Sequence, residues 1–128
     1  MRIIKLIISL FILVLFMNCV QDTKSKTITL TVDMNGIENV ENVGVRGSNL
    51  PLSWKETIFL TDEDNDGIYQ KTFSINTASY DLEFKFVKNS DFFELENQNN
   101  RSIVFEYKPE TITYKATFNN QEEKIIRK

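Results

Sequence analysis

Hydrophobic and polar residues alternate along most of this chain after residue 26. In residues 27–34 one face carries only large apolar side chains, namely Ile28, Leu30, Val32 and Met34. A period of two is typical of a β-strand that buries one face. The same pattern, interrupted by turn residues, predicts further strands at residues 43–48, 56–60, 68–75, 80–87, 102–107 and 111–118.

The spacing of these strands indicates the fold class. Short strands about every ten residues, with turn chemistry between them, are typical of an antiparallel β-sandwich. We therefore predict an all-β, immunoglobulin-like β-sandwich of seven to eight short strands over residues 27–120, followed by a charged tail at 121–128. The ten phenylalanines and four tyrosines can fill such a core without a disulfide.

The N-terminal residues 1–18 have a different character. Arg2 and Lys5 lead into a 12-residue run, residues 6–17, that is apolar except for one serine. The run is shorter than the ~20 residues of a spanning helix and fits the apolar core of a secretory signal. We expect residues 1–18 to be a signal peptide; an uncleaved signal anchor is one alternative.

Cys19, at the end of this run, is the only cysteine of the chain. The arrangement resembles a bacterial lipoprotein signal, which implies that Cys19 is acylated and that residues 19–26 are a lipidated tether. Several acyl chains on one residue anchor firmly where a single chain binds marginally. The expected location is the bacterial cell envelope, at the outer rather than the inner membrane. The other alternative is an ordinary secretory signal that leaves Cys19 as an unmodified thiol.

Charge narrows the range of partners and activities. Without residues 1–18 the chain has 13 basic and 18 acidic residues, a net charge of −5. An acidic domain without a basic stripe is a poor binder of nucleic acid or of anionic lipid headgroups, so the membrane link should be the lipid alone. The chain has no histidine, and its one cysteine is assigned to the anchor. We expect neither catalysis nor a cofactor.

Residues 80–101 gather the candidate ligand-binding groups. The strand at 80–87 places Tyr80, Leu82, Phe84 and Phe86 on one face and Lys85 on the other. A turn at 89–91 leads to a short second strand and then to a polar corner at 97–101, Asn-Gln-Asn-Asn-Arg. Ammonium, carboxylate and amide groups of this kind form hydrogen bonds with neutral hydroxyls.

The order of features resembles the starch-binding domains of carbohydrate-binding module family 20 and the related glycogen-binding early-set modules. The resemblance spans about residues 27–118 and rests on Val-Gly-Val-Arg-Gly-Ser at 43–48, Trp54, Leu-Glu-Phe-Lys-Phe-Val at 82–87, Leu95-Glu96 and Asn100-Arg101. It implies that Trp54 stacks on glucose and that Lys85, Glu96 and Asn100 bind hydroxyls. Leu95 occupies the place of the second platform tryptophan, and Phe92 or Phe93 could supply the missing ring.

The resemblance implies a function. By this resemblance, the chain is expected to be a non-catalytic, membrane-anchored module that binds starch- or glycogen-like α-glucan near a cell-surface glycan-processing or import complex. The alternative, which Leu95 favours, is a structural or protein-interaction lipoprotein domain with a decayed glycan site. Each side chain also has a structural interpretation: Trp54 could cap the core, Lys85 could be solvated, and Arg101 could pair with a carboxylate.

An acidic stretch at residues 62–67 raises the question of a metal. Asp62, Asp64, Asp66 and Gly67 match the first half of a calcium loop. The twelfth position is Phe73, so the bidentate glutamate is missing. We predict an acidic hairpin turn, with calcium as the weaker alternative.

Overall fold

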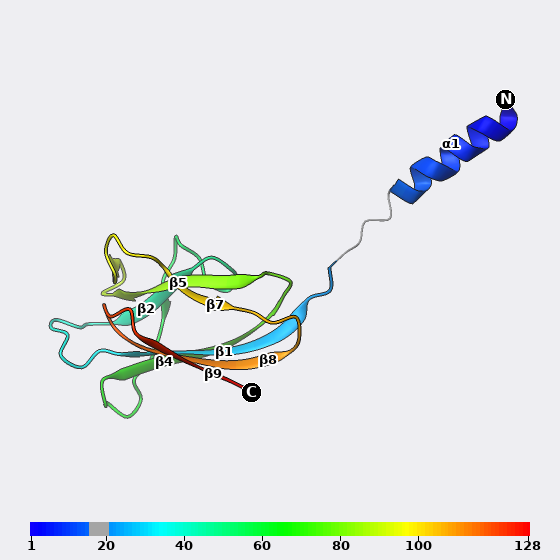
Figure 1. The fold of residues 1–128 in the computed structure, drawn as a ribbon. Coiled ribbons are helices and arrows are strands. Elements are labelled where there is room, and N and C mark those ends of the chain that lie inside the picture. Colours follow the sequence, from blue (N-terminus) through cyan, green and yellow to red (C-terminus); the bar gives the residue numbers. More distant parts are fainter. Residues whose placement is uncertain (16–20) are drawn as a thin grey trace.

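The computed structural model describes residues 1–15 and 21–128, which form one helix and two stacked β-sheets (Figure 1). Helix α1 spans Arg2–Leu15. The strands are β1 (Lys24–Asp33), β2 (Val43–Gly47), β3 (Ile58–Phe59), β4 (Ile68–Thr77), β5 (Asp81–Lys88), β6 (Phe92–Phe93), β7 (Arg101–Val104), β8 (Glu110–Thr117) and β9 (Glu123–Arg127). Cys19, the predicted lipidation site, lies outside the described residues.

The strands form a four-stranded sheet, ordered β4-β1-β8-β9, packed on a five-stranded sheet. In the second sheet β3, β2 and β5 follow one another, and both β6 and β7 pair with β5. The predicted all-β sandwich is confirmed, with nine strands in the described part of the chain. One pair departs from the antiparallel pattern, because β1 and β8 run parallel.

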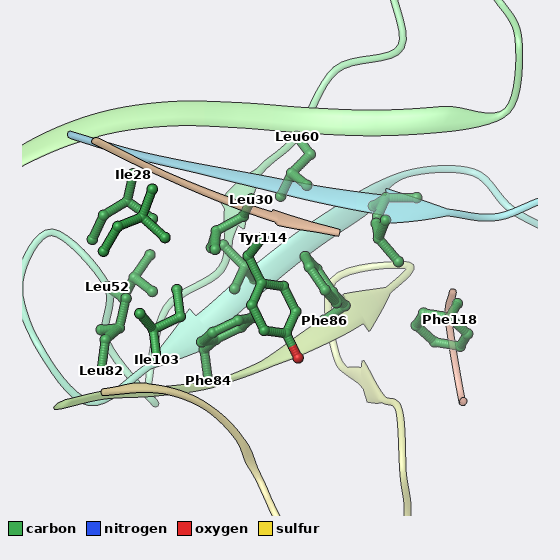
Figure 2. Packing of buried hydrophobic residues seen from close by; sticks show 14 of the residues in the cluster. Ile28, Leu30, Leu52, Leu60, Leu82, Phe84, Phe86, Ile103, Tyr114 and Phe118 are labelled. Atoms are coloured by element: carbon green, nitrogen blue, oxygen red, sulfur yellow. The ribbon is translucent and has the colours of Figure 1, made fainter. Parts of the chain in front are cut away.

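The core lies between the two sheets and follows the predicted alternation (Figure 2). Its largest aromatic contacts are edge-to-face, with the Phe84 ring 4.9 Å from that of Tyr114 and 5.6 Å from that of Phe86. Tyr80 was expected on the buried face but is 75% exposed. It precedes β5, which begins at Asp81, and therefore lies outside the strand whose alternate residues face the core.

Both ends of the predicted domain are longer than expected. Residues 121–128, predicted to be a charged tail, include β9, which pairs with β8 and packs Ile125 against the core. Strand β1 begins at Lys24 and takes in residues 24–26 of the predicted tether. Lys26 is 1% exposed because its ammonium forms an ion pair with Glu110 at 2.6 Å.

Strand directions define the two ends of the sandwich. Strands β1, β5 and β8 begin, and β2, β4, β7 and β9 end, at one end of the sandwich, which we call the proximal end because the first strand, β1, begins there (Figure 1). The opposite, distal end carries the loops at residues 34–42, 60–67, 89–91 and 118–122.

Helix α1 has 14 residues, and within the described chain no helix is long and apolar enough to cross a membrane.

Candidate functional site

The candidate site is built on a loop between β6 and β7. Both strands pair with the same edge of β5, β6 with Val87 and Lys88 and β7 with residues 81–84. Residues 94–100 therefore loop out between them, and we call this segment the β6–β7 loop. The carboxylate of Glu94 accepts the N–H of Phe86 at 2.8 Å and so takes the place of a missing strand partner.

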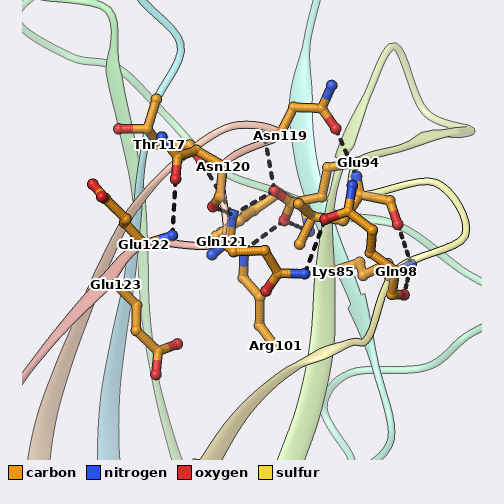
Figure 3. Close-up of polar contacts among 12 residues, drawn as sticks. Lys85, Glu94, Gln98, Arg101, Thr117, Asn119, Asn120, Gln121, Glu122 and Glu123 are labelled. Carbon is orange, nitrogen blue, oxygen red and sulfur yellow. Dashed lines mark hydrogen bonds and ion pairs between the residues drawn. The ribbon is translucent and has the colours of Figure 1, made fainter.

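A buried ion pair closes the neck of the β6–β7 loop (Figure 3). Arg101 donates to both carboxylate oxygens of Glu94, at 2.7 and 2.8 Å, and the two side chains are 1% and 0% exposed. Burial alone would lower the pKa of Arg101, but the hydrogen bonds and charge of Glu94 outweigh it and raise the pKa. The interpretation of Arg101 as the partner of a carboxylate is confirmed.

Arg101 also ties this loop to the turn between β8 and β9. Its Nη2 donates to the carbonyls of Thr117 and Asn120 at 3.1 and 2.8 Å. On the same side, the Asn119 side-chain oxygen accepts the N–H of Leu95 at 2.8 Å. The two loops are thus held as one polar unit at the edge of the sandwich (Figure 3).

Lys85 and Leu95 have positions different from those the resemblance implies. The Lys85 ammonium donates to the carbonyls of Leu95 and Gln98 at 2.9 and 3.1 Å, so it braces the β6–β7 loop from below. Leu95 adopts φ 51°, turns into the protein and is fully buried. Its assignment as a carbohydrate contact is therefore wrong, because a ligand cannot reach it.

Beside this loop lies a shallow depression of about 350 Å³, which we call the hairpin hollow. It is lined by Lys85, Asp91, Phe92, Phe93, Glu94, Glu96 and Asn97. Phe92 is 55% exposed, and its ring lies 5.0 Å from the Lys88 ammonium. The hollow brings Lys85 and Glu96 together as expected, whereas Asn100 lies exposed in the same loop and does not line the hollow.

Trp54 lines a different depression of about 330 Å³, the Trp54 hollow, between β2 and β3. The Trp54 side chain is 38% exposed, so it is not a cap buried in the core. Arg46 stands between the two hollows: it donates to the carbonyls of Trp54 and Ser90 at 3.2 and 3.0 Å, and its guanidinium lies 5.2 Å from the Phe93 ring. The predicted pairing of Trp54 with Lys85 in one site is not observed, because they line separate hollows.

The acidic loop at residues 61–67 has the hydrogen bonds of a turn. Asp62 accepts the N–H groups of Asp66 and Gly67 at 3.2 and 2.9 Å, and Asp66 accepts that of Ile68 at 2.9 Å. Carboxylate oxygens of the three aspartates lie within 4.8 Å of one another. Hydrogen bonding with Asp66 and Asp62 raises the pKa of Asp64. Backbone donors account for this loop as the acidic hairpin turn that the sequence predicts.

Three residues important to the hairpin hollow were not predicted as site residues. Glu94, Asp91 and Asn97 all line it, and Glu94 is buried whereas Asp91 and Asn97 are exposed. The sequence signal for Glu94 was present but weak: a carboxylate stands three residues before the polar corner, and the corner itself ends in an arginine, Arg101. Phe92, considered only as a substitute ring, is the exposed aromatic residue of the hollow.

No protein-family model matches the chain, and no curated protein matches it. Two solution structures of modules from the beta/alpha-amylase of Paenibacillus polymyxa are similar to it. For CBM25-2 the TM-score is 0.46 at 14% identity, over 82% of this chain and 94% of that module. For CBM25-1 the TM-score is 0.45 at 16% identity, over 81% and 93%. Both likenesses are distant.

Proposed function

We propose that this protein is a non-catalytic carbohydrate-binding domain that holds starch- or glycogen-like α-glucan at the hairpin hollow. The observation that carries the proposal is the exposed ring of Phe92 in the same hollow as Lys85, Glu96 and Asn97. Sugar rings have flat C–H faces that pack on aromatic rings, and hydroxyls that exchange hydrogen bonds with carboxylates and amides. The hollow offers both kinds of contact.

The loop that carries these groups is held in place before a ligand arrives. Glu94 and Arg101 fix its neck, and Lys85 fixes two of its carbonyls. Fixing the binding groups in advance reduces the ordering cost of association. Because the hollow is shallow, we expect contact with few sugar rings and a modest affinity, which a polymer with many equivalent sites strengthens through avidity. Trp54, in the neighbouring hollow, could extend the contact along a longer glucan.

The proposal includes a lipid anchor. Cys19 follows the apolar run and is acylated in this scheme, so the domain is tethered to the bacterial envelope, at the outer membrane, beside a glycan-processing or import complex. The apolar sequence of residues 6–17 and the lone cysteine support the anchor. Metabolic labelling with a radioactive fatty acid tests it, and a Cys19→Ala variant should lose the label.

Affinity electrophoresis through soluble starch and glycogen tests the glucan site. We expect the chain to be retarded, Phe92→Ala to lose most of the retardation, and Trp54→Ala to lose a smaller part. Tyr107→Ala is the matched control, because this tyrosine is 63% exposed but lines neither hollow. Equal migration of wild type and Phe92→Ala, with and without glucan, contradicts the proposal.

Two observations favour the protein-interaction alternative enough to keep it. Leu95 is buried and Trp54 lines a separate hollow, so the hairpin hollow has no tryptophan. A pull-down from solubilised membranes, in which a partner is recovered in stoichiometric amount without glucan, would support this second function.

A further inference from the structure

The proximal end of the sandwich carries a group of exposed apolar side chains. Leu50 is 83% exposed, Tyr80 75%, Tyr107 63% and Val104 44%. They come from three separate segments: the loop after β2, the short β4–β5 connection, and the end of β7 with the turn that follows it. Large side chains are usually this exposed only singly, so a group of them at one end indicates a surface that is covered in use.

Hydrogen bonds join these segments into one surface. The Asn49 side chain, next to Leu50, donates to the Asp81 carbonyl at 3.3 Å. The N–H of Phe105 donates to the Tyr80 carbonyl at 2.9 Å. These contacts place the Leu50 loop, Tyr80 and the end of β7 side by side.

The turn that carries Tyr107 is held by buried charge. The Lys26 ammonium donates to the carbonyls of Glu106 and Lys108 at 2.6 and 2.5 Å, and to the Glu110 carboxylate at 2.6 Å. Tyr107, between the two braced carbonyls, therefore has a fixed backbone beneath an exposed ring. Burying a lysine costs desolvation free energy. Its use to hold this turn indicates that the conformation of the turn matters for a contact.

The number of residues between Cys19 and β1 limits how far this surface can lie from an anchored lipid. Lys24, the first residue of β1, is five residues after Cys19, and five residues span at most about 18 Å. We propose that the proximal end docks on the lipid bilayer, with Tyr80, Tyr107 and Leu50 in the headgroup region. This rests on the lipid anchor of the proposed function and adds a second contact to it, in place of the expectation from charge that the lipid is the whole membrane link.

The side chains of this surface suit the boundary between the headgroups and the acyl chains of a bilayer, and they are not a set of charges that would bind anionic headgroups. Tyrosine has an apolar ring and a hydroxyl that stays hydrated, which is why it is enriched at the edges of bilayers. Two of the nearby basic groups already have partners: Lys24 lies 4.7 Å from the Tyr107 ring, and Lys108 pairs with Glu106 at 2.8 Å. Docking therefore depends mainly on apolar contact.

Docking in this way orients the glucan site. Strand β5 begins with Asp81 at the proximal end and ends with Lys88, which pairs with Phe92 of the hairpin hollow. Eight residues of strand extend about 25 Å. The Phe92 end of the hairpin hollow therefore lies at the end of the sandwich away from the bilayer, where a polymer can reach it, whereas the Trp54 hollow, which Leu50 also lines, lies closer to the bilayer.

Fluorescence quenching in vesicles tests the docking. The acylated chain, residues 19–128, is reconstituted in vesicles of phosphatidylethanolamine and phosphatidylglycerol, with a polarity-sensitive fluorophore on Tyr80→Cys, Tyr107→Cys or Glu63→Cys. The last is the control, because Glu63 is exposed in the acidic loop at the distal end. We expect lipid-borne nitroxide to quench positions 80 and 107 several-fold more than position 63, and aqueous iodide to show the reverse. In Tyr80→Ser/Tyr107→Ser, a fluorophore on Leu50→Cys should lose its shielding from iodide.

The other outcomes contradict the proposal in distinguishable ways. Equal iodide quenching at all three positions, in chains that float with the vesicles, overturns docking while the anchor stands. Shielding from both quenchers means that protein rather than lipid covers this end. If the chain does not float with the vesicles, both the lipid anchor and the docking are contradicted. The starch electrophoresis reports on the glucan site independently of these vesicle experiments.

Discussion

Two buried ion pairs stand at different places in this sandwich, and they differ in what they hold. Glu94 and Arg101 join the neck of the β6–β7 loop to the turn between β8 and β9. Lys26 and Glu110 join the first residues of β1 to the turn before β8, and Arg127 of β9 adds a second cation at 2.5 Å from Glu110. Each pair lies under an exposed loop that we assign to a contact: the first to glucan, the second to lipid.

The two ion pairs differ in the number of cations that neutralise the buried carboxylate. Arg101 is the one cation paired with Glu94 in the described part of the chain, whereas Glu110 has two. A buried carboxylate that loses its only cation keeps the full desolvation penalty, and one that keeps a second cation does not. The β6–β7 loop therefore depends on a single cation, whereas the turn at the proximal end tolerates more change.

The largest expected effect is that of Arg101→Met. Because this variant leaves Glu94 buried without a cation, it should lower the free energy of unfolding by about 3–5 kcal/mol in urea denaturation. Retardation by starch should also disappear at temperatures where the variant is still folded. The control is Glu94→Gln/Arg101→Met, which should recover part of the stability. A loss of less than about 1 kcal/mol would remove the asymmetry between the two pairs.

Lys26→Met should have the next largest effect. Glu110 keeps Arg127, so we expect a loss of about 2 kcal/mol, below that of Arg101→Met. Retardation by starch should be unchanged in the folded fraction, because Lys26 does not contact the β6–β7 loop. Loss of starch binding in a folded Lys26→Met protein would show that the two pairs do not act separately.

Acid should weaken the proximal pair. Burial would raise the pKa of Glu110, but hydrogen bonds from Lys26, the Glu106 N–H and Arg127 outweigh it and lower the pKa below the ordinary 4.5. A carboxylate whose pKa is lower in the folded state stabilises the fold above its unfolded pKa, and that stability is lost as the pH falls through the folded pKa. We therefore expect the free energy of unfolding to fall as the pH is lowered from neutral through the pKa of Glu110.

Comparison of urea unfolding in wild type and Lys26→Met at neutral pH and below the pKa of Glu110 isolates this contribution. The variant lacks the donor that contributes most to the lowering, so its stability should fall less with acid. An equal decline in both proteins would assign the pH dependence to other carboxylates.

The smallest effect should be that of Arg127→Met. Its guanidinium side chain is 32% exposed, and Lys26 still neutralises Glu110 after the change. Partly exposed pairs contribute little, so we expect a loss of about 0.5–1 kcal/mol in the free energy of unfolding. A loss equal to that of Lys26→Met would mean that the two cations are equivalent rather than primary and secondary.

Most of the sandwich could be predicted because one face of each long strand is buried. The alternation in β1, β5 and β8 is a direct record of that burial. Strand β9 was not predicted, because Ile125 and Ile126 are adjacent rather than alternating and its other residues are charged. An edge strand with one paired neighbour needs little apolar pattern, so its sequence resembles a tail.

The candidate site was predictable in chemistry but not in arrangement. Lysine and glutamate are almost never fully buried unless paired, so sequence alone favours exposure for Lys26 and Glu94. Their partners become visible only when the strands are placed in space. The inward turn of Leu95 depends on a positive φ, which leucine rarely adopts, and on an acceptor from Asn119 in a distant turn. Trp54 is held away from Lys85 by Arg46, a link that no sequence spacing indicates.

The central position of β1 has a mechanical consequence for an anchored protein. This strand pairs along ten residues with β4 and along eight with β8, and it is also the strand that continues into the tether. In the proposed arrangement, a bound polymer that pulls away from the membrane would apply tension to β1 along its own axis. The hydrogen bonds of both ladders would then bear the load together rather than break one by one. An anchored domain of this topology would therefore resist force at the strand where the force enters.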